Sequence, residues 1–213
     1  MSEARVRPRD AATLIIWRRS ARGLEVLMGR RAGGHRFMPD RYAFPGGRLE
    51  PGDAGTPALT ELRPEVAAVL ASHSRPARAR ALAVAAVREA YEETGLAVGE
   101  VRDGVLLPAL DRLDYLLRAI TPSASPIRFH ARFFTVAAEQ VAGELRGNGE
   151  LLDLSWRTAE ECMQLPSANV TQFVLKRAAA EQSLSFADRV ELFSFRNARP
   201  TTRPFLHRPH TPR

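Results

Sequence analysis

The sequence contains very little cysteine, almost no lysine and no long apolar run. Its single cysteine, Cys162, excludes a disulfide within the chain and a metal cluster held by several thiolates. No apolar run approaches the roughly 18 residues that a membrane helix needs, so no membrane partner is expected. The N-terminal residues show no cleavage signature of a secretory signal. We therefore expect a cytoplasmic protein.

The positive charge of the chain comes almost entirely from arginine. Lys176 is the only lysine, and the formal net charge is +7. Arginine binds phosphates and carboxylates with two parallel hydrogen bonds, so this composition suits anionic partners. Nucleotide bias in a genome produces the same composition, and solvated arginines need no ligand. The charge is thus an argument about association alone.

The length and composition predict one folded domain with appendages. The chain has 213 residues, of which 45% are hydrophobic and 26% charged, values typical of a globular protein with a real core. We expect a flexible arm over residues 1–10, a domain over 11–195 and a basic, proline-rich tail without fixed structure over 196–213. Interleaved strand and helix patterns predict an α/β (α+β) domain.

Local patterns give a coarse order of elements. Alternation or short apolar runs predict strands at 13–17, 24–29, 41–44, 127–137, 151–156 and 191–195, the first two joined as a hairpin and 127–137 half-buried. Helix-forming residues predict helices at 64–71, 81–94, 103–118, 159–165 and 171–181. The helix at 81–94 has the strongest signal, and Gly95 follows it at the usual terminating position.

Three carboxylates are expected on one face of the 81–94 helix. Glu89 and Glu93 are four residues apart, and Glu92 is three from Glu89. Acids in the last helical turn oppose the helix dipole, so something other than helix stability is expected to keep them there. Hard cations such as Mg²⁺ or Mn²⁺ prefer oxygen ligands, and binding one would relieve the repulsion among the three carboxylates. The pattern therefore indicates a metal site. The alternative is a solvated acidic face.

A glycine-rich loop precedes this helix. Residues 44–53 read Phe-Pro-Gly-Gly-Arg-Leu-Glu-Pro-Gly-Asp, and consecutive glycines at 46 and 47 let the backbone approach a ligand closely. Alone, this run predicts only a turn. Its pairing with the acidic helix is what makes it informative.

The two segments together resemble the Nudix box, the signature of hydrolases that cleave a nucleoside diphosphate linked to another moiety. The family pattern is Gly, five residues, Glu, seven residues, then Arg-Glu-aliphatic-x-Glu-Glu-x-Gly-aliphatic. The matching positions here are Gly47, Asp53, Arg88, Glu89, Glu92, Glu93, Gly95 and Leu96.

The match departs from the pattern in three ways. Asp53 replaces the usual glutamate, and Ala90 stands for a larger aliphatic residue. Between Asp53 and Arg88 lie 34 residues (54–87) where the pattern has seven, which places a 27-residue insertion, 54–80, inside the box. Such an expanded box is similar to one branch of the family, that of the nucleoside diphosphate-linked moiety X motif 19 protein, whose members resemble coenzyme A diphosphatases.

The resemblance implies a fold, a metal and a set of roles. The fold is the Nudix α/β/α sandwich, with a mixed sheet between helices. Mg²⁺ or Mn²⁺ would be held by Glu89, Glu92, Glu93 and the carbonyl of Gly46. Arg88 would pair with Glu92, and with Asp53 if the loop folds back, and so orient the carboxylates.

Residues outside this ligand set complete the candidate site. Glu92, Glu93 and Arg88 are candidate catalytic residues, and Glu150, or Glu144, is a candidate general base outside the box. Gly47 and the arginines before the loop are candidates for substrate binding: Arg30, Arg31 and Arg36. For the outer acids the alternative is an ordinary turn residue, and for each arginine it is a surface charge.

The sequence therefore predicts a Mg²⁺-dependent hydrolase of a nucleotide diphosphate substrate, with coenzyme A or acyl-coenzyme A as the first expectation. ADP-ribose or a dinucleotide is the enzymatic alternative, and a non-catalytic nucleotide- or RNA-binding domain is the other. All three box glutamates are present, which favours catalysis. Nucleic-acid binding is not expected, because the tail has Phe205 as its only aromatic residue. A homodimer is left open.

Overall fold

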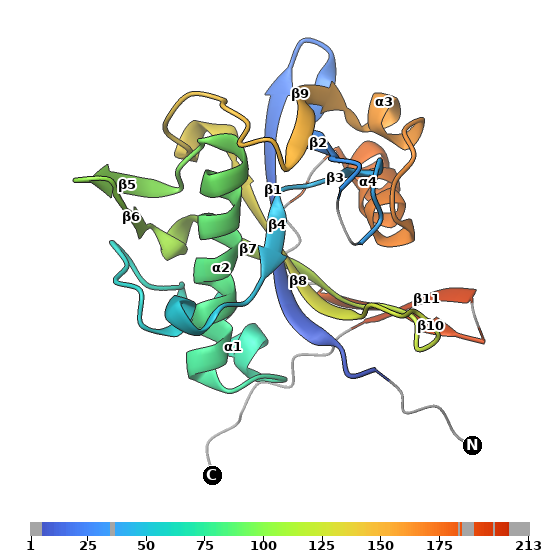
Figure 1. Ribbon diagram of the computed structural model, residues 1–213, viewed down its shortest axis with the longest axis horizontal. Helices are drawn as coiled ribbons and strands as arrows, with labels where there is room; N and C mark the ends of the chain where they lie inside the picture. Colours follow the sequence, from blue (N-terminus) through green and yellow to red (C-terminus); the bar gives the residue numbers. More distant parts are fainter. Residues whose placement is uncertain (1–5, 35–36, 183, 185–189, 198, 205–213) are drawn as a thin grey trace.

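The computed structural model describes residues 6–34, 37–182, 184, 190–197 and 199–204. Within these residues, nine strands form one mixed sheet in the order β11-β10-β7-β8-β1-β2-β3, with β4 and β9 added beside β1 and β2. Helices cover both faces of this sheet, α1 and α2 on one and α3 and α4 on the other (Figure 1). This arrangement confirms the predicted α+β sandwich.

The centre of the sheet is the long strand β1 (Arg9–Ser20). It runs parallel to β8 (Phe129–Ala137) along one edge. Its other edge is shared, because its N-terminal half pairs with β4 (Gly46–Arg48) and its C-terminal half with β2 (Gly23–Arg31). The predicted hairpin of β1 and β2 is confirmed, and both strands are longer than expected. The branching edge of β1 brings the glycine loop into the sheet.

The remaining strands extend the sheet in both directions. On the side of β8 lie β7 (Asp114–Ile120), β10 (Glu191–Arg196) and β11 (Arg199–Pro204). On the side of β2 lie β3 (Tyr42–Ala43) and β9 (Leu151–Thr158). Short 3₁₀ turns connect several elements: η1 (Pro51–Ala54), η2 (Leu110–Arg112) and η3 (Ala138–Gln140).

The two faces of the sheet have separate cores. Leu14 and Ile16 of β1 point into the core under α1 (Pro64–Ala71) and α2 (Pro76–Thr94). Ile15 points the other way, toward α3 (Ala159–Met163) and α4 (Asn169–Glu181). A strand buried on both faces reads as a continuous apolar run, which explains the pattern at 13–17.

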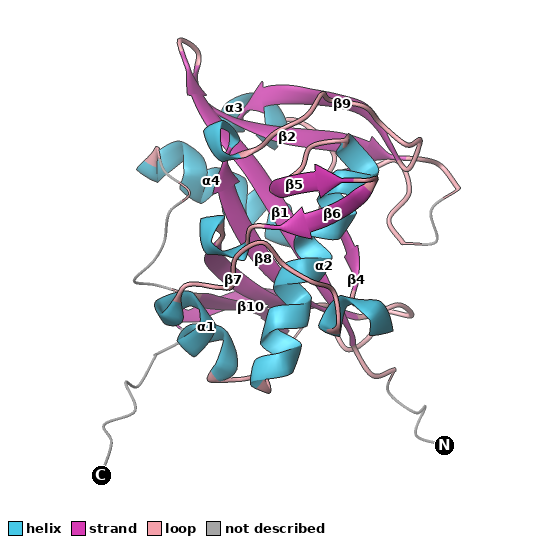
Figure 2. Ribbon diagram, turned by 90° about the vertical axis from the view of Figure 1, so that its left-hand side faces the viewer, coloured by secondary structure: helices cyan, strands magenta, loops and turns pink. Residues whose placement is uncertain are grey.

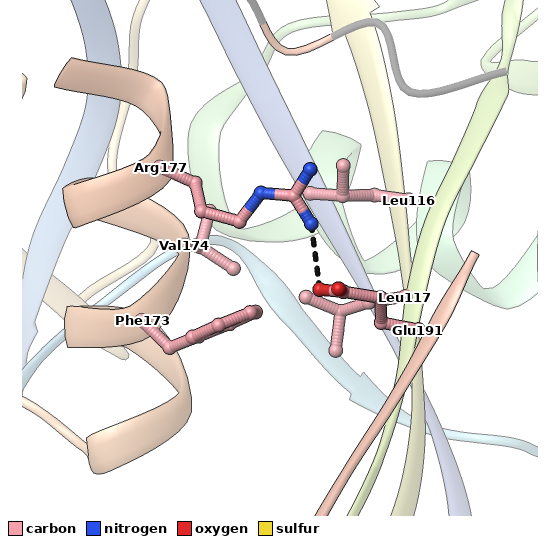
Figure 3. Close-up of a pocket in the computed structure, with 6 residues that line it drawn as sticks. All are labelled: Leu116, Leu117, Phe173, Val174, Arg177 and Glu191. Carbon is pink, nitrogen blue, oxygen red and sulfur yellow. Dashed lines mark hydrogen bonds and ion pairs between the residues drawn. The ribbon is translucent and has the colours of Figure 1, made fainter. Parts of the chain in front are cut away.

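Helix α4 closes the second core against β7 and β10. Figure 3 shows Phe173 and Val174 of α4 facing Leu116 and Leu117 of β7. At the edge of this contact, Arg177 Nη1 donates to the Glu191 carboxylate over 2.6 Å. The cavity between them is about 10 Å³, at the lower limit for one water molecule, so it is too small for a substrate.

The insertion forms helical structure beside the box. Its residues make α1, confirmed at Pro64–Ala71, and lengthen α2, which begins at Pro76 rather than at 81. Proline at the first helical position and the alanines that follow account for the earlier start. Val66 and Leu70 of α1 are buried against α2. The insertion is therefore packed onto the domain core.

The helix predicted at 103–118 is wrong. This segment contains β6 (Val105–Pro108), η2 and most of β7, and β6 pairs with β5 (Gly99–Arg102) as a ribbon beside α2 (Figure 2). Asp103 and Gly104 both have positive φ, 51° and 78°. This is the conformation that an Asp-Gly hairpin turn requires, and the dipeptide is the signal that the helix prediction missed.

Two further expectations need correction. Strand β8 is half-buried only at its start, because Arg132 and the four residues after it are all buried. The tail predicted to lack structure from residue 196 forms β11, whose backbone pairs with β10. Residues 205–213 lie outside the described residues. No helix in the described chain combines the length and apolar character needed to span a bilayer.

Candidate active site

The glycine loop and the acidic end of α2 meet at the branching edge of β1. Strand β4 pairs with Ala11–Thr13 of β1 and packs against α2. A side chain on Gly46 would overlap the backbone of β1, since an added Cβ would lie 2.4 Å from the carbonyl oxygen of Ala12. Glycine at 46 therefore lets the loop join the sheet at close range.

Each glycine faces one of the box acids. The backbone N–H of Gly46 donates to the Glu93 carboxylate over 2.8 Å. An added Cβ on Gly47 would lie 2.3 Å from the carboxylate of Glu89. The predicted juxtaposition of the twin glycines and the acidic helix is present, across an insertion of 27 residues.

Arg88 joins the two halves of the box. Its Nε donates to Asp53 Oδ1 over 2.8 Å and its Nη2 to the carbonyl of Arg48 over 3.1 Å. Its Nη1 contacts Glu92 at 3.0 Å and Glu89 at 3.1 Å. Asp53 is 1% exposed and also accepts the Glu50 N–H. The predicted contacts of Arg88 with Glu92 and Asp53 are both present.

The three glutamates have different environments. Glu93 is 4% exposed, and burial together with the neighbouring Glu89 raises its pKa to about 8. Burial also raises the pKa of Glu89, helped by the charges of Glu92 and Glu150. Glu92 lies at the surface in its pair with Arg88. Two acids are thus partly buried side by side with too little positive charge to match them.

Arg31 brings a positive charge to the buried acids. It opposes the rise in the pKa of Glu93, while burial lowers the pKa of Arg31 itself. Its Nη1 donates to the carbonyl of Phe37 over 3.3 Å. In β2, Arg30 alternates to the opposite face and pairs with Asp40 at 2.7 Å. Neighbouring residues of a strand point to opposite faces, and this alternation is the sequence signal that distinguishes the two arginines.

The remaining predicted residues have mixed outcomes. Glu150 is exposed on the loop before β9, where its carbonyl accepts the Ala32 N–H over 3.0 Å, and its charge acts on both buried acids. Glu144 pairs with Arg146 at the surface. Arg36 lies outside the described residues. Cys162 is buried, and burial raises the pKa of its thiol to about 12, so it is no nucleophile.

The donor chemistry fits a hard divalent cation in part. Glu89 and Glu93 offer oxygen ligands, and two carboxylates buried side by side favour a positive charge between them. Across the described residues, no three His, Cys, Asp or Glu side chains are already gathered as a metal site. Glu92 is held apart by Arg88, so the expected three-carboxylate cluster is not preassembled.

Solved structures with a similar fold identify the architecture. A Nudix hydrolase from Alicyclobacillus acidocaldarius is 29% identical, with a TM-score of 0.63, over 85% of this chain and 99% of that one. The chain has the Nudix hydrolase fold. A mutator MutT protein from Bacillus halodurans is 14% identical, with a TM-score of 0.51, over 92% of this chain and 97% of that one.

A third similar structure contains a nucleotide-derived ligand. The Nudix domain of Shewanella oneidensis NrtR, solved with ADP-ribose, is 13% identical, with a TM-score of 0.50, over 86% of this chain and 94% of that one. No protein-family model and no curated protein matches the sequence. The similarities confirm the Nudix fold and support the predicted enzyme class, a hydrolase of pyrophosphate bonds.

Proposed function

We propose that this chain is a Mg²⁺-dependent Nudix hydrolase that cleaves the pyrophosphate bond of a nucleoside diphosphate linked to another moiety. The observation that carries the proposal is the assembled box. Gly46 and Gly47 contact Glu93 and Glu89, and Arg88 binds Asp53, although 34 residues separate the last two. An insertion of that size would be expected to break these contacts if the box residues had no function.

Glu89 and Glu93 would hold the divalent cation, with Glu92 and the Gly46 carbonyl as further candidate ligands. Such an ion lowers the pKa of bound water and neutralises phosphate charge. Two acids that are buried beside each other favour a bound cation at this place. The Gly46 N–H fixes the Glu93 carboxylate, and Gly47 leaves room for that of Glu89.

Arg88 acts as a positioning residue in this proposal. Its guanidinium is engaged by Asp53, Glu89, Glu92 and a backbone carbonyl, which leaves it no free edge for a phosphate. The buried Asp53 fixes the guanidinium, and the guanidinium in turn fixes the two glutamates. The shorter side chain of Asp53 is sufficient, because η1 brings it to 2.8 Å from Arg88.

Glu150 is our candidate general base outside the box. It is exposed, and its backbone is attached to the end of β2, close enough for its charge to raise the pKa of Glu89 and Glu93. Arg31 lies at the same end of β2 on the side of the buried acids and is the candidate for substrate phosphates. Arg30 faces the other way and pairs with Asp40, so we do not assign it this role.

The proposed substrate class is coenzyme A or acyl-coenzyme A. This choice rests on the resemblance of the expanded box to that branch of the family. ADP-ribose and dinucleotides are the alternatives, and the ADP-ribose bound to the Shewanella domain is consistent with nucleotide ligands on this fold.

A substrate panel tests the proposal. Purified protein is incubated with coenzyme A, ADP-ribose and a dinucleoside polyphosphate, with Mg²⁺ and with a chelator, and products are separated by chromatography. We expect Mg²⁺-dependent cleavage, with coenzyme A cut to a 3′,5′-ADP-type product and a phosphopantetheine. Cleavage of another diphosphate alone would refute the coenzyme A assignment. Binding without cleavage of any of them would refute the enzyme.

A further inference from the structure

A cleft lies beside the N-terminal half of β1. Figure 1 shows the elements around it, the start of β1, the end of β4 and the beginning of α2. The volume of the cleft is about 510 Å³, large enough for a phosphorylated small molecule or for one end of a longer one. Three segments line it: the start of β1, the end of β4 with the beginning of η1, and the first turn of α2. The lining residues are Pro8, Arg9, Asp10, Arg48, Leu49, Glu50, Pro51 and Arg78.

Three arginines and two carboxylates line this cleft, which gives it a net positive charge. Arg9 and Arg48 are exposed, and within the part of the chain that is described their side chains make no hydrogen bond or ion pair. Arg78 pairs with Asp10, so its charge and that of the carboxylate largely cancel. The first turn of α2 contains no acid, and its dipole adds partial positive charge at Arg78. Glu50 is the other acidic residue of the lining.

A buried arginine stands directly behind the wall. Arg132 is 2% exposed, and its Nη1 donates to Asp10 Oδ1 over 2.7 Å. Its Nε is buried without a hydrogen-bond partner in the described structure. Asp10 is therefore shared between Arg132 inside and Arg78 outside, and one carboxylate balances two guanidinium groups. Arg118, which donates to His130, adds further positive charge nearby.

His130 lies beside Asp10 in this wall. Its Nδ1 is 3.6 Å from Asp10, a contact that would favour the imidazolium. Burial and the charges of Arg132 and Arg118 nevertheless lower its pKa to about 3. Counted by residue, the arginines of the cleft and its wall outnumber the two carboxylates of Asp10 and Glu50: Arg9, Arg48, Arg78, Arg118 and Arg132.

We propose that this cleft is a phosphate-binding site, in which Arg9, Arg48 and Arg78 receive a phosphate monoester. Arginine is suited to this ligand because its planar fork donates two parallel hydrogen bonds to phosphate oxygens. Arg48 follows Gly47 in β4, so the site adjoins the box without using its acids. The phosphate belongs either to the far end of the hydrolysed substrate or to a separate organic phosphate.

The primary test measures binding and needs no turnover. Inorganic phosphate is titrated into the full-length protein at low ionic strength without metal, and Kd is measured by calorimetry for wild type and for the double variant Arg9→Gln/Arg48→Gln. We expect the variant to bind at least about tenfold more weakly. Arg102→Gln, which removes an exposed arginine of the β5–β6 ribbon, should bind like wild type. Thermal unfolding without phosphate checks that all variants fold.

Equal affinity of the double variant and wild type would overturn the proposal, as would an equal loss in the Arg102→Gln control. A second arm identifies the source of the phosphate and rests on the proposed function. KM is compared for coenzyme A and dephospho-coenzyme A, which differ by one phosphate monoester, in wild type and in Arg9→Gln. A rise in KM for coenzyme A alone assigns the cleft to the substrate. Unchanged KM values together with weakened phosphate binding assign it to a separate ligand.

Discussion

Both ends of helix α2 have charges that the helix dipole disfavours, arginines at the N-terminal end and glutamates at the C-terminal end. The two ends differ in how these charges are neutralised. At the N-terminal end, Arg78 pairs with Asp10 and Arg80 with Glu61, so carboxylates from other elements neutralise the arginines. At the C-terminal end, Glu89 and Glu93 are buried together and their pKa values rise.

The difference separates charges that are paired from charges that are left under-compensated. Ion pairs at the N-terminal end attach the insertion and β1 to the helix. The acids at the C-terminal end remain under-compensated, because Arg88 is divided among several carboxylates. Groups with strongly shifted pKa values collect where a protein performs chemistry or binds ions. Substitutions at the two ends should therefore change different properties.

The largest effect is expected from removing the charge of Glu93. Glu93→Gln keeps an oxygen that accepts the Gly46 N–H, and it replaces an acid that burial already disfavours in its charged form, so the fold should persist. Turnover with Mg²⁺ should fall by about 10²–10⁴-fold, because a cation that loses a charged ligand gives up several kcal/mol of transition-state stabilisation. Steady-state kinetics and thermal unfolding measure the two properties.

Glu100→Gln is the matched control for this change, because Glu100 is exposed on the β5–β6 ribbon and pairs only with Arg102 among the described residues. It should leave turnover unchanged. Full activity of Glu93→Gln would contradict a chemical role for the acids at this end of α2.

The next largest effect is expected at Gly47. In Gly47→Ala the new methyl group would overlap the Glu89 carboxylate, so that carboxylate must move. It can do so because it is the flexible end of a side chain. We expect a stable protein whose kcat/KM for its diphosphate substrate falls by about 10–100-fold, as when a ligand loses its orientation. Gly52→Ala is the control, since nothing lies within 4 Å of its added Cβ. Equal activity of both variants would show that the position of Glu89 does not matter.

Sequence patterns predicted the elements and contacts that depend on neighbours in the chain. Helix α1 begins and ends where its proline and alanines indicate, and the shared face of Glu89 and Glu93 follows from helical spacing. The contact of Arg88 with Asp53 was predictable only through the family resemblance, because the insertion separates them. Its presence depends on how α1 and η1 pack.

Properties set by distant parts of the chain were missed. The burial of Arg132 depends on β7 and β1 flanking β8, which alternation along β8 does not reveal. Strand β11 exists because β10 offers an edge, although its own residues are proline- and arginine-rich. The contrast between exposed Glu92 and buried Glu93 depends on where β4 meets α2, a tertiary result that helical spacing cannot predict.

A smaller effect, on stability, tests the charge around the N-terminal end of α2. The pKa of His130 is lowered to about 3 from an ordinary value of 6.5, so the unfolded chain binds a proton more readily than the folded one between these values. The stability contributed by neutral His130 is therefore complete above pH 6.5 and is lost as pH falls. Between pH 7 and pH 5, wild type should lose about 2 kcal/mol more than His130→Gln.

Urea unfolding at both pH values measures this difference. Glutamine at position 130 retains an oxygen that accepts the Arg118 N–H but does not titrate. His73, whose pKa is lowered to about 4 by burial and by Arg118 and Arg132, supplies a second test through His73→Gln. Parallel pH profiles for wild type and His130→Gln would contradict the lowered pKa of His130.

The smallest effect is expected where the comparison assigns a purely structural use. Arg80 holds Glu61 through Nε and Nη2, both at 2.8 Å, and donates to the Thr56 carbonyl over 3.1 Å, which attaches the insertion loop to α2. Arg80→Gln should reduce the free energy of unfolding by about 0.5–1 kcal/mol, because Glu61 is largely exposed. Activity should be unchanged, and Arg102→Gln should change neither property. A loss of turnover in Arg80→Gln would mean that the attachment of the insertion to α2 affects the positions of the box residues. The two ends of α2 would then be coupled.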